Sequence, residues 1–285
     1  MLNNQEAHLI SELFYRLDTN VRNDLYKGVI ADERDCVSRL VSHLNYPFGI
    51  LTQVIFGNLQ LKSEWFTQVN SGSLERKFGC DFMIAFEVDN KVKIALIEAK
   101  WPRVIKDPKY NWDYLQKSNK TSHFTDQIRR QSNWTNQAFI WEMFFYEEKP
   151  NIINTPFDQY ASTCIPHSFA MNEINTNPNL SVLWDNNDLN NLIQNTQTNG
   201  YQGRNETNLR TMIYNLLRCK YGTPIKIDEY DRSINLYSEN LNEQIRIPRI
   251  DFNEQSDAKN NDVVSTFMTK TGLQMFQYFK IENAK

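Results

Sequence analysis

Two neighbouring apolar segments constrain the fold of this chain more than any other feature. Residues 80–88 (CDFMIAFEV) and 92–99 (VKIALIEA) are rich in β-branched and aromatic residues, and only Asp89-Asn90-Lys91 separates them. Two such runs around a turn predict an antiparallel β-hairpin. The second run is apolar on both faces from Ile94 to Ile97, which is typical of a central strand covered on both sides.

The segments around this hairpin predict a mixed α/β layout. In chain order, the expected elements are helices within 1–26 and 31–44, short strands or a hairpin over 51–56 and 59–65, a helix over 122–134 and a buried strand over 138–146. Acidic residues lie in the first turn of the second helix, where the helix dipole favours them. A helix, a hairpin, a helix and a strand in this order indicate an α/β domain.

Beyond residue 150 the chain is rich in asparagine, and its patterning is weaker. The expected elements there are a strand over 180–184, helices over 189–193 and 209–217, strands over 234–237 and 245–250, and a C-terminal helix over 263–279. We therefore predict an α/β domain over residues 1–200 and an α+β C-terminal accessory region over residues 201–285, for DNA contact or self-association.

Length and composition define the class of protein. The 285 residues suffice for one large domain or for one domain with an appendage, and 40% hydrophobic and 23% charged residues are typical of globular proteins. The longest apolar run, 138–146, is too short to cross a bilayer and contains Glu142. Because the amino terminus also lacks a signal-peptide pattern, we expect a cytoplasmic protein without membrane contact.

The cysteines also favour a cytoplasmic location. Cys36, Cys80, Cys164 and Cys219 lie far apart with no paired spacing, which fits reduced thiols. The fragment Cys164-Ile-Pro-His167 has half of the donors of a metal site, but no second half with suitable spacing exists. We interpret it as a buried thiol and a loop histidine.

Charged side chains lie at the end of the hairpin that is opposite its turn. Glu98 and Lys100 are two residues apart at the end of an apolar strand, so they project to the same side, and hairpin pairing brings Asp81 beside Glu98. Two adjacent carboxylates repel each other unless a divalent cation lies between them, and Mg²⁺ prefers such oxygen ligands. Lys100 could polarise or help to deprotonate an attacking water, or stabilise charge on phosphorus.

Asp81, the hairpin and Glu98-Ala99-Lys100 resemble the signature of the PD-(D/E)xK nuclease superfamily, which includes type II restriction endonucleases, Holliday-junction resolvases and recombination exonucleases. Cys80 stands where the proline of the family name would be, at a position that varies in the family. The resemblance covers roughly residues 31–146. It implies a restriction-endonuclease-like core, a mixed central β-sheet flanked by helices, and hydrolysis of DNA phosphodiester bonds that depends on Mg²⁺, with Mn²⁺ as a substitute.

The resemblance also implies roles for residues outside the hairpin. Members often carry a metal-binding Glu on a helix before the hairpin; Glu33 is our candidate, with Glu64 and Glu75 as alternatives, and a helix-capping charge is the other explanation of Glu33. Members often carry a Gln on the helix after the Glu-x-Lys strand, and Gln127 fits that role unless it lies on a solvated helix face. The predicted metal ligands are thus Asp81, Glu98 and Glu33, and the predicted catalytic residues are Asp81, Glu98, Lys100 and Gln127.

The segment after the hairpin is basic, although the net charge of the chain is -3. Its eight basic residues are Lys100, Arg103, Lys106, Lys109, Lys117, Lys120, Arg129 and Arg130, and its three acids are Asp107, Asp113 and Asp126. Such a local excess can face phosphates, and a solvated lysine-rich loop has the same pattern. Trp101, Trp112 and Trp134 could stack on bases, although core packing is the more common role.

These observations predict a DNA endonuclease of restriction or phage defence. We expect a homodimer, because cutting both strands needs two active sites. A resolvase or a transposon end-cleaving nuclease would share the same residues. The alternative from another class is a non-catalytic module that keeps the fold and binds nucleic acid or protein. An intact set of Asp81, Glu98 and Lys100 argues against it, because a buried acidic cluster is costly.

Overall fold

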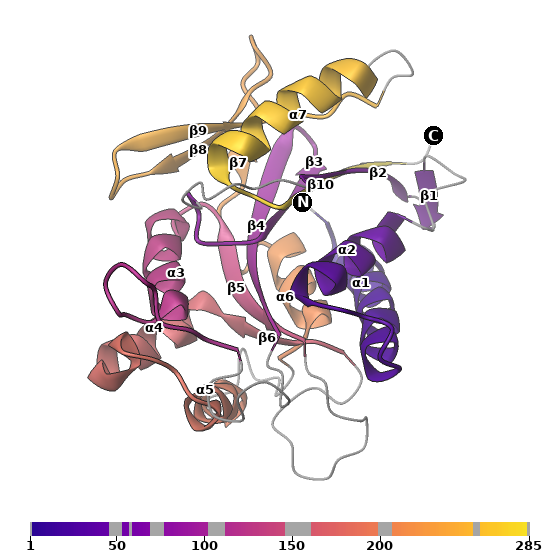
Figure 1. Ribbon diagram of the computed structural model, residues 1–285. Coiled ribbons are helices and arrows are strands. Elements are labelled where there is room, and N and C mark those ends of the chain that lie inside the picture. Colours follow the sequence, from indigo (N-terminus) through magenta and orange to yellow (C-terminus); the bar gives the residue numbers. More distant parts are fainter. Residues whose placement is uncertain are drawn as a thin grey trace.

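The computed structural model describes residues 2–45, 53–56, 59–68, 77–101, 112–145, 161–198, 207–252 and 257–283. Its centre is an eight-stranded mixed β-sheet with helices on both faces, so the protein is of the α/β class (Figure 1). In spatial order, the described strands are β1 (Gln53–Phe56), β2 (Leu59–Thr67), β10 (Met275–Asn283), β3 (Phe82–Val88), β4 (Lys91–Lys100), β5 (Phe139–Phe144) and β6 (Thr163–Pro166), with β7 (Ile225–Lys226) beside the start of β4.

The expected hairpin is the middle of this sheet. Strands β3 and β4 pair antiparallel, with Phe82 opposite Ile97, and Asp89 and Asn90 in the turn both have positive φ. Two central turn residues with positive φ match the right-handed twist of the flanking strands. Strand β5 is parallel to β4, and β10 is parallel to β3. The hairpin therefore lies in the middle of the sheet, as the apolar run in β4 predicts for a central strand.

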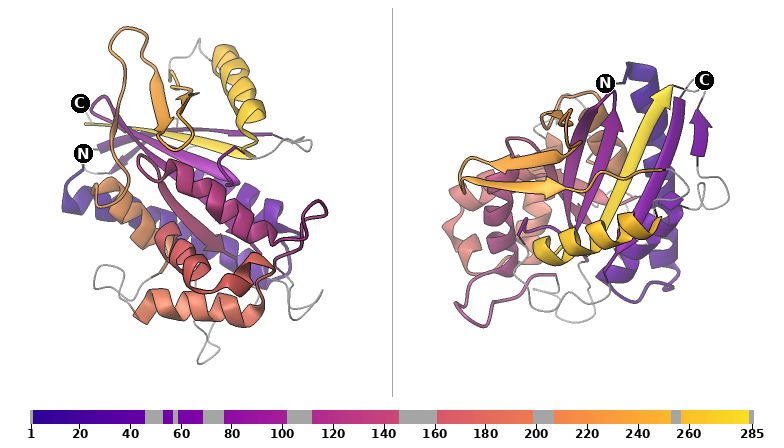
Figure 2. Two further views of the ribbon diagram at one scale, coloured as in Figure 1. Left: turned by 90° about the vertical axis from the view of Figure 1, so that its left-hand side faces the viewer. Right: turned by 90° about the horizontal axis from the view of Figure 1, so that it is seen from above.

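Helices cover one face of the sheet and a mixed layer covers the other (Figure 2). The first face holds α1 (Asn4–Tyr26), α2 (Glu33–Asn45) and α6 (Leu209–Leu217). The second holds α3 (His123–Gln131), η1 (Ser132–Trp134), α4 (His167–Thr176), η2 (Pro178–Ser181), α5 (Asn186–Thr198), the hairpin β8 (Ile234–Ser238) and β9 (Glu243–Ile247), and α7 (Asp257–Thr271). On the first face Phe14 of α1 packs against Phe86 of β3 and Phe279 of β10, with ring centroids 5.7 Å and 5.4 Å away.

The predicted C-terminal helix over 263–279 is wrong in its second half. Helix α7 ends at Thr271, Gly272 follows with a φ of 72°, and residues 275–283 form the central strand β10. Phe276 and Tyr278 of this strand pack on one face of the sheet, and Phe279 and Ile281 pack on the other. Because both faces are apolar, the segment lacks the alternation that identifies a strand.

The predicted strand over 180–184 is also wrong. Its start belongs to the short 3-10 helix η2, and no strand follows before α5. Thr125 of α3 holds this segment in place, because its hydroxyl donates to the Leu180 carbonyl at 2.6 Å and accepts from Trp184 Nε1 at 2.7 Å. Leu180 and Trp184 are buried against α3, so their apolar character reflects tertiary packing instead of strand pairing.

The fragment Cys164-Ile-Pro-His167 lies at the junction of β6 and α4. Cys164 is a buried free thiol, as expected, but His167 begins helix α4 and does not lie in a loop.

The domain boundary near residue 200 stays a prediction, because it concerns whether the two parts of the chain fold independently. The central sheet itself combines strands from both sides of that boundary, because β10 lies between β2 and β3. Among the described residues, no helix has the length and hydropathy that crossing a bilayer requires.

Lys93 of β4 gives the folded state a testable dependence on pH. Its buried ammonium group donates to the carbonyls of Tyr221, at 2.6 Å, and Gly222, and burial lowers the pKa of Lys93 to about 8. The folded protein therefore loses this proton at lower pH than the unfolded chain, and the contribution of Lys93 to stability rises between about pH 8 and 10.5.

The unfolding free energy of the wild type should therefore increase with pH over this range. In Lys93→Met we expect this increase to be smaller by about 2 kcal/mol, after allowance for solvent screening. Urea unfolding of both proteins at several pH values measures the difference. Equal pH slopes in the two proteins would show that Lys93 keeps its ordinary pKa in the folded state.

Candidate active site

The structure places Asp81 directly beside Glu98. The pairing of Phe82 with Ile97 continues by one residue, because the Asp81 N–H donates to the Ile97 carbonyl at 2.9 Å. The Ala99 N–H then donates to Asp81 Oδ2, also at 2.9 Å. Opposite residues of an antiparallel pair project to the same face. Asp81 and Glu98 are both fully buried there, where the apolar part of each strand ends.

Lys100 and Gln127 complete a compact polar cluster with Glu98. The Lys100 ammonium donates to Glu98 Oε1 at 2.6 Å and to Gln127 Oε1 at 2.8 Å, and Gln127 Nε2 also donates to Glu98 Oε1. Helix α3 presents Gln127 to the sheet, and the Lys100 ammonium lies 5.3 Å from the centroid of the Phe124 ring on the same helix. Gln127 is completely buried, so it does not lie on a solvated helix face.

Glu33 acts on this cluster electrostatically. It is the first residue of α2 and is half-buried. Burial alone lowers the pKa of Lys100, but the negative charges of Glu98, Glu33 and Asp81 outweigh burial and raise that pKa above its ordinary value.

The structure describes one of the two alternatives to Glu33. Glu64 accepts a hydrogen bond from Asn260 of α7, and Glu75 lies outside the described residues. Glu33, by contrast, has a described electrostatic interaction with Lys100 of the cluster.

Gln274 is a residue of the site that the sequence did not predict. It lies between α7 and β10, where its side-chain Nε2 donates to Asp81 Oδ1 and its backbone N–H donates to the Asp81 carbonyl, both at 2.8 Å. The prediction of a continuous helix over 263–279 placed Gln274 inside that helix and so gave no reason to assign it to the site. An amide inside the apolar stretch Leu273–Phe276 was the signal that could have identified it.

A further buried carboxylate, Glu142, lies next to Glu98 on the parallel strand β5. Gln131, one helical turn after Gln127, donates from Nε2 to Glu142 Oε2 at 3.3 Å and to the Gly79 carbonyl at 2.9 Å. Helix α3 thus supplies one glutamine to each glutamate. The glutamate inside the apolar run 138–146 was the sequence signal for this second pair.

His167 extends this second pair away from the sheet. With the Gln131 amide group donating through Nε2, its Oε1 accepts from His167 Nδ1 at 2.9 Å. His167 Nε2 then accepts from the Ser132 hydroxyl at 3.0 Å. These bonds connect α3, η1 and the start of α4 and fix the helices that cover the site.

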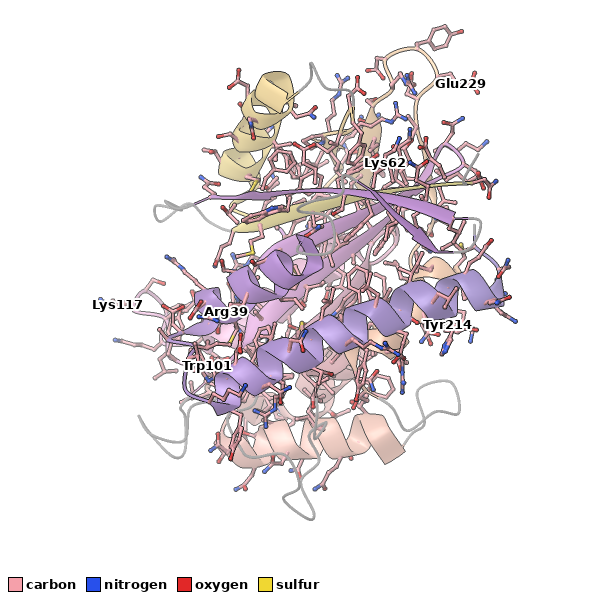
Figure 3. The ribbon with its side chains drawn as sticks, turned by 90° about the vertical axis from the view of Figure 1, so that its right-hand side faces the viewer. Arg39, Lys62, Trp101, Lys117, Tyr214 and Glu229 are labelled. Carbon is pink, nitrogen blue, oxygen red and sulfur yellow. The ribbon has the colours of Figure 1, made fainter. Side chains whose placement is uncertain are left out.

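The basic segment after β4 contributes more to packing than its charge indicates. Residues 102–111 lie outside the described structure. Asp113 accepts from the backbone N–H groups of Phe124 and Trp184 at 3.1 Å and so joins α3 to the chain before α5. Trp101, Trp112 and Trp134 are buried, which confirms core packing as their role. By contrast, Lys117 points outward at the edge of the molecule (Figure 3).

The donor set of the site fits Mg²⁺. Within the described part of the chain, no three His, Cys, Asp or Glu side chains form a group that could hold a metal ion by themselves. Mg²⁺ commonly binds through one or two carboxylates and fills its other positions with water and phosphate oxygens. Asp81 and Glu98 meet that requirement because they offer two adjacent carboxylates at the end of a strand pair.

Comparison of this chain with protein-family models, with curated proteins and with solved structures finds no match.

Proposed function

We propose that this protein is a Mg²⁺-dependent endonuclease with a restriction-endonuclease-like core that hydrolyses DNA phosphodiester bonds in restriction or phage defence. One observation carries the proposal: Asp81, Glu98, Lys100 and Gln127 form a single buried polar cluster where the central apolar strands end. Burying charged groups at this density is costly for stability. Such a cost is understandable where the groups perform chemistry.

Each residue of the cluster has a role in this proposal. Asp81 and Glu98, with Glu33 from α2, would hold Mg²⁺ or Mn²⁺, which supplies charge neutralisation at the phosphate and a more acidic bound water. Lys100 places a positive charge beside Glu98, where it would stabilise negative charge that develops on the phosphate. Gln127 bonds to both Glu98 and Lys100 and would keep these two side chains oriented toward the substrate.

A cleavage assay with a panel of substrates tests the proposal. The purified protein is incubated with plasmid DNA, branched DNA, single-stranded DNA and RNA, with Mg²⁺, with Mn²⁺ and with EDTA. We expect DNA cleavage that requires the divalent ion. Absence of cleavage on every substrate would refute the endonuclease and leave a module that binds nucleic acid or protein. Since duplex cleavage needs two active sites, we also propose that the protein works as a homodimer.

Gln274 provides a prediction that concerns orientation of Asp81. Gln274→Met removes the side-chain hydrogen bond to Asp81 Oδ1 and keeps a side chain of similar length. We expect the cleavage rate to fall by about tenfold, because Asp81 loses one of the bonds that orient it. The apparent affinity for Mg²⁺, measured from the dependence of cleavage on ion concentration, should fall with it.

The matched control is Gln277→Met, because Gln277 lies three residues later, in β10, and bonds to Ser63 of β2 instead of Asp81. A Gln274→Met enzyme with unchanged rate and unchanged Mg²⁺ dependence would show that Asp81 needs no such support.

A further inference from the structure

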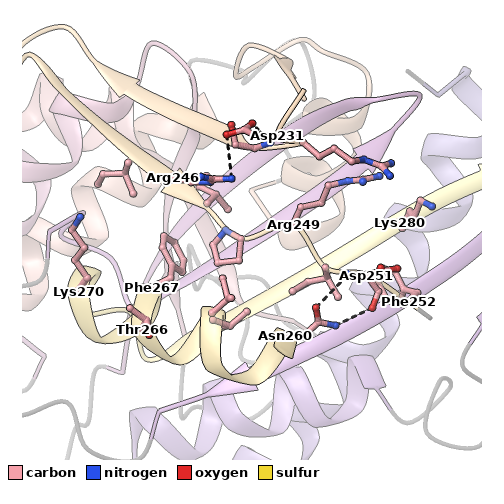
Figure 4. A pocket seen from close by; sticks show the side chains of 18 residues that line it. Asp231, Arg246, Arg249, Asp251, Phe252, Asn260, Thr266, Phe267, Lys270 and Lys280 are labelled. Atoms are coloured by element: carbon pink, nitrogen blue, oxygen red, sulfur yellow. Dashed lines mark hydrogen bonds and ion pairs between the residues drawn. The ribbon is translucent and has the colours of Figure 1, made fainter. Parts of the chain in front are cut away.

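A groove lies between the β8–β9 hairpin, the segment that follows it and helix α7. It has a volume of about 770 Å³. Its apolar surface includes Pro248, Ile250 and Phe252 from the connecting segment and Phe267 from α7. Figure 4 shows Lys270 and Lys280 at opposite sides of the view, with Arg246 and Arg249 between them. No part of this groove overlaps the residues of the proposed active site.

The lining of the groove carries an excess of positive charge. Its five cations are Arg232, Arg246, Arg249, Lys270 and Lys280, and its two carboxylates are Asp231 and Asp251. Local charge of one sign in a concave surface attracts polyanions even when the whole chain is slightly acidic, as here with a net charge of -3. The charge of the groove is therefore opposite to that of the protein as a whole.

Three of the five cations already have carboxylate partners. Arg249 forms a two-bond pair with the buried Glu87, Arg246 lies 3.2 Å from Asp231, and Lys280 lies 2.5 Å from Glu282. The Glu87 pair fixes Arg249 in the floor of the groove, where the Tyr278 hydroxyl also donates to Glu87.

Arg232 and Lys270 differ from these three. Neither forms an ion pair with any residue that the structure describes, and both are exposed. An incoming anion can therefore bind them without breaking a contact that exists in the described structure.

The position of the groove connects it to the proposed active site. Groove residues on the sheet and the carboxylates Asp81 and Glu98 belong to the same face, the face that carries α3 and α7. Lys270 is in the last turn of α7, and the chain then passes through Gly272 to Gln274, which bonds to Asp81. The end of α7 that lines the groove at Lys270 is thus joined by a short length of chain to Gln274 and the site.

We propose that this groove binds the sugar-phosphate backbone of a nucleic-acid strand and guides the strand to the active site. The inference deepens the proposed function and rests on it for the direction of the strand. Arg232, Arg246 and Lys270 contact phosphates, Arg249 and Glu87 keep the floor rigid, and Phe252 provides an apolar surface for a base. Basic grooves with aromatic side chains bind single strands in this way without reading their sequence.

The test uses the full-length protein and a fluorescently labelled single-stranded oligonucleotide in EDTA, so that binding is measured without cleavage. The variant is Arg232→Gln/Lys270→Gln, which removes two charges without leaving a described carboxylate unpartnered. We expect the Kd from fluorescence anisotropy to rise about tenfold, and the slope of log Kd against log salt to fall by about 1.4, for two lost phosphate contacts. Thermal unfolding verifies that the variant is folded.

Arg16→Gln is the matched control. Arg16 is exposed on α1, which covers the opposite face of the sheet, and it pairs only weakly with Glu12 at 3.4 Å. Its Kd and salt slope should equal those of the wild type. Arg16→Gln removes one charge where the double variant removes two. If it gives half or more of the change in log Kd seen in the double variant, binding follows net charge and the groove proposal is wrong.

Two further outcomes separate this proposal from the proposed function. Strand binding that depends on the groove, in a protein that cleaves no substrate, supports the groove and refutes the endonuclease. Cleavage that requires Glu98, with unchanged binding and cleavage in the double variant, supports the endonuclease and refutes the groove. Displacement of the oligonucleotide by an equal concentration of a mononucleotide would also overturn the proposal, because it would identify a small-molecule pocket.

Discussion

Glu98→Gln should reduce Mg²⁺-dependent DNA cleavage by roughly a thousandfold or more, the largest change in activity that we expect from one substitution. The substitution keeps the size of the side chain and removes its negative charge. Glu98 bonds to Lys100 at 2.6 Å and to Gln127, so its loss affects the proposed metal ligand and the orientation of both partners together. Initial rates on plasmid DNA measure the effect.

Glu282→Gln is the control for this substitution. Glu282 also accepts from lysines, because it pairs with Lys62 at 3.0 Å and with Lys280 at 2.5 Å, but it lies at the far end of β10 from Asp81. We expect it to cleave at the wild-type rate. Retained cleavage in a folded Glu98→Gln protein would contradict the catalytic assignment. Lys100→Met should lose activity to a similar extent, since the same cluster then lacks its cation.

Gly79→Ala adds one methyl group and should lower the free energy of unfolding by about 3 kcal/mol, the largest loss of stability that we expect from one substitution. Gly79 has a φ of 67°, and a methyl group there would lie 2.5 Å from the backbone carbonyl oxygen of Gln127. A backbone oxygen cannot move aside without a shift of α3. We therefore expect cleavage to fall as well, because Gln127 would move away from Glu98 and Lys100.

Gly28→Ala separates the two causes of this loss. Gly28 has a similar φ of 70°, but a methyl group there meets no atom within 4 Å. Its cost is confined to the backbone conformation, about 1 kcal/mol. Urea unfolding of both variants gives the difference, which measures the contact with α3. Equal destabilisation by the two substitutions would mean that α3 does not pack against Gly79. Wild-type cleavage by Gly79→Ala would mean that activity does not require Gln127 to keep its position beside Glu98 and Lys100.

The local part of the site was predictable because short-range rules govern it. The turn at Asp89 and Asn90 joins two apolar runs, and hairpin pairing follows from that alone. Side chains two residues apart in a strand share a face, so Glu98 and Lys100 had to project together. Gln127 could be placed one element later because helix α3 is the next described element after β4 in the chain.

The sequence by itself thus determined the central hairpin, the helices that flank it and the place where the charged residues meet. Only the tertiary structure decided which distant segments complete the sheet and the site. Strand β10 is apolar on both faces and shows no period, so its place beside β3 follows from contacts that no local pattern encodes. Gln274 reaches Asp81 through that placement, and Glu142 reaches Glu98 through the parallel pairing of β5. These partners are far apart in the chain, and only burial of the shared core brings them together.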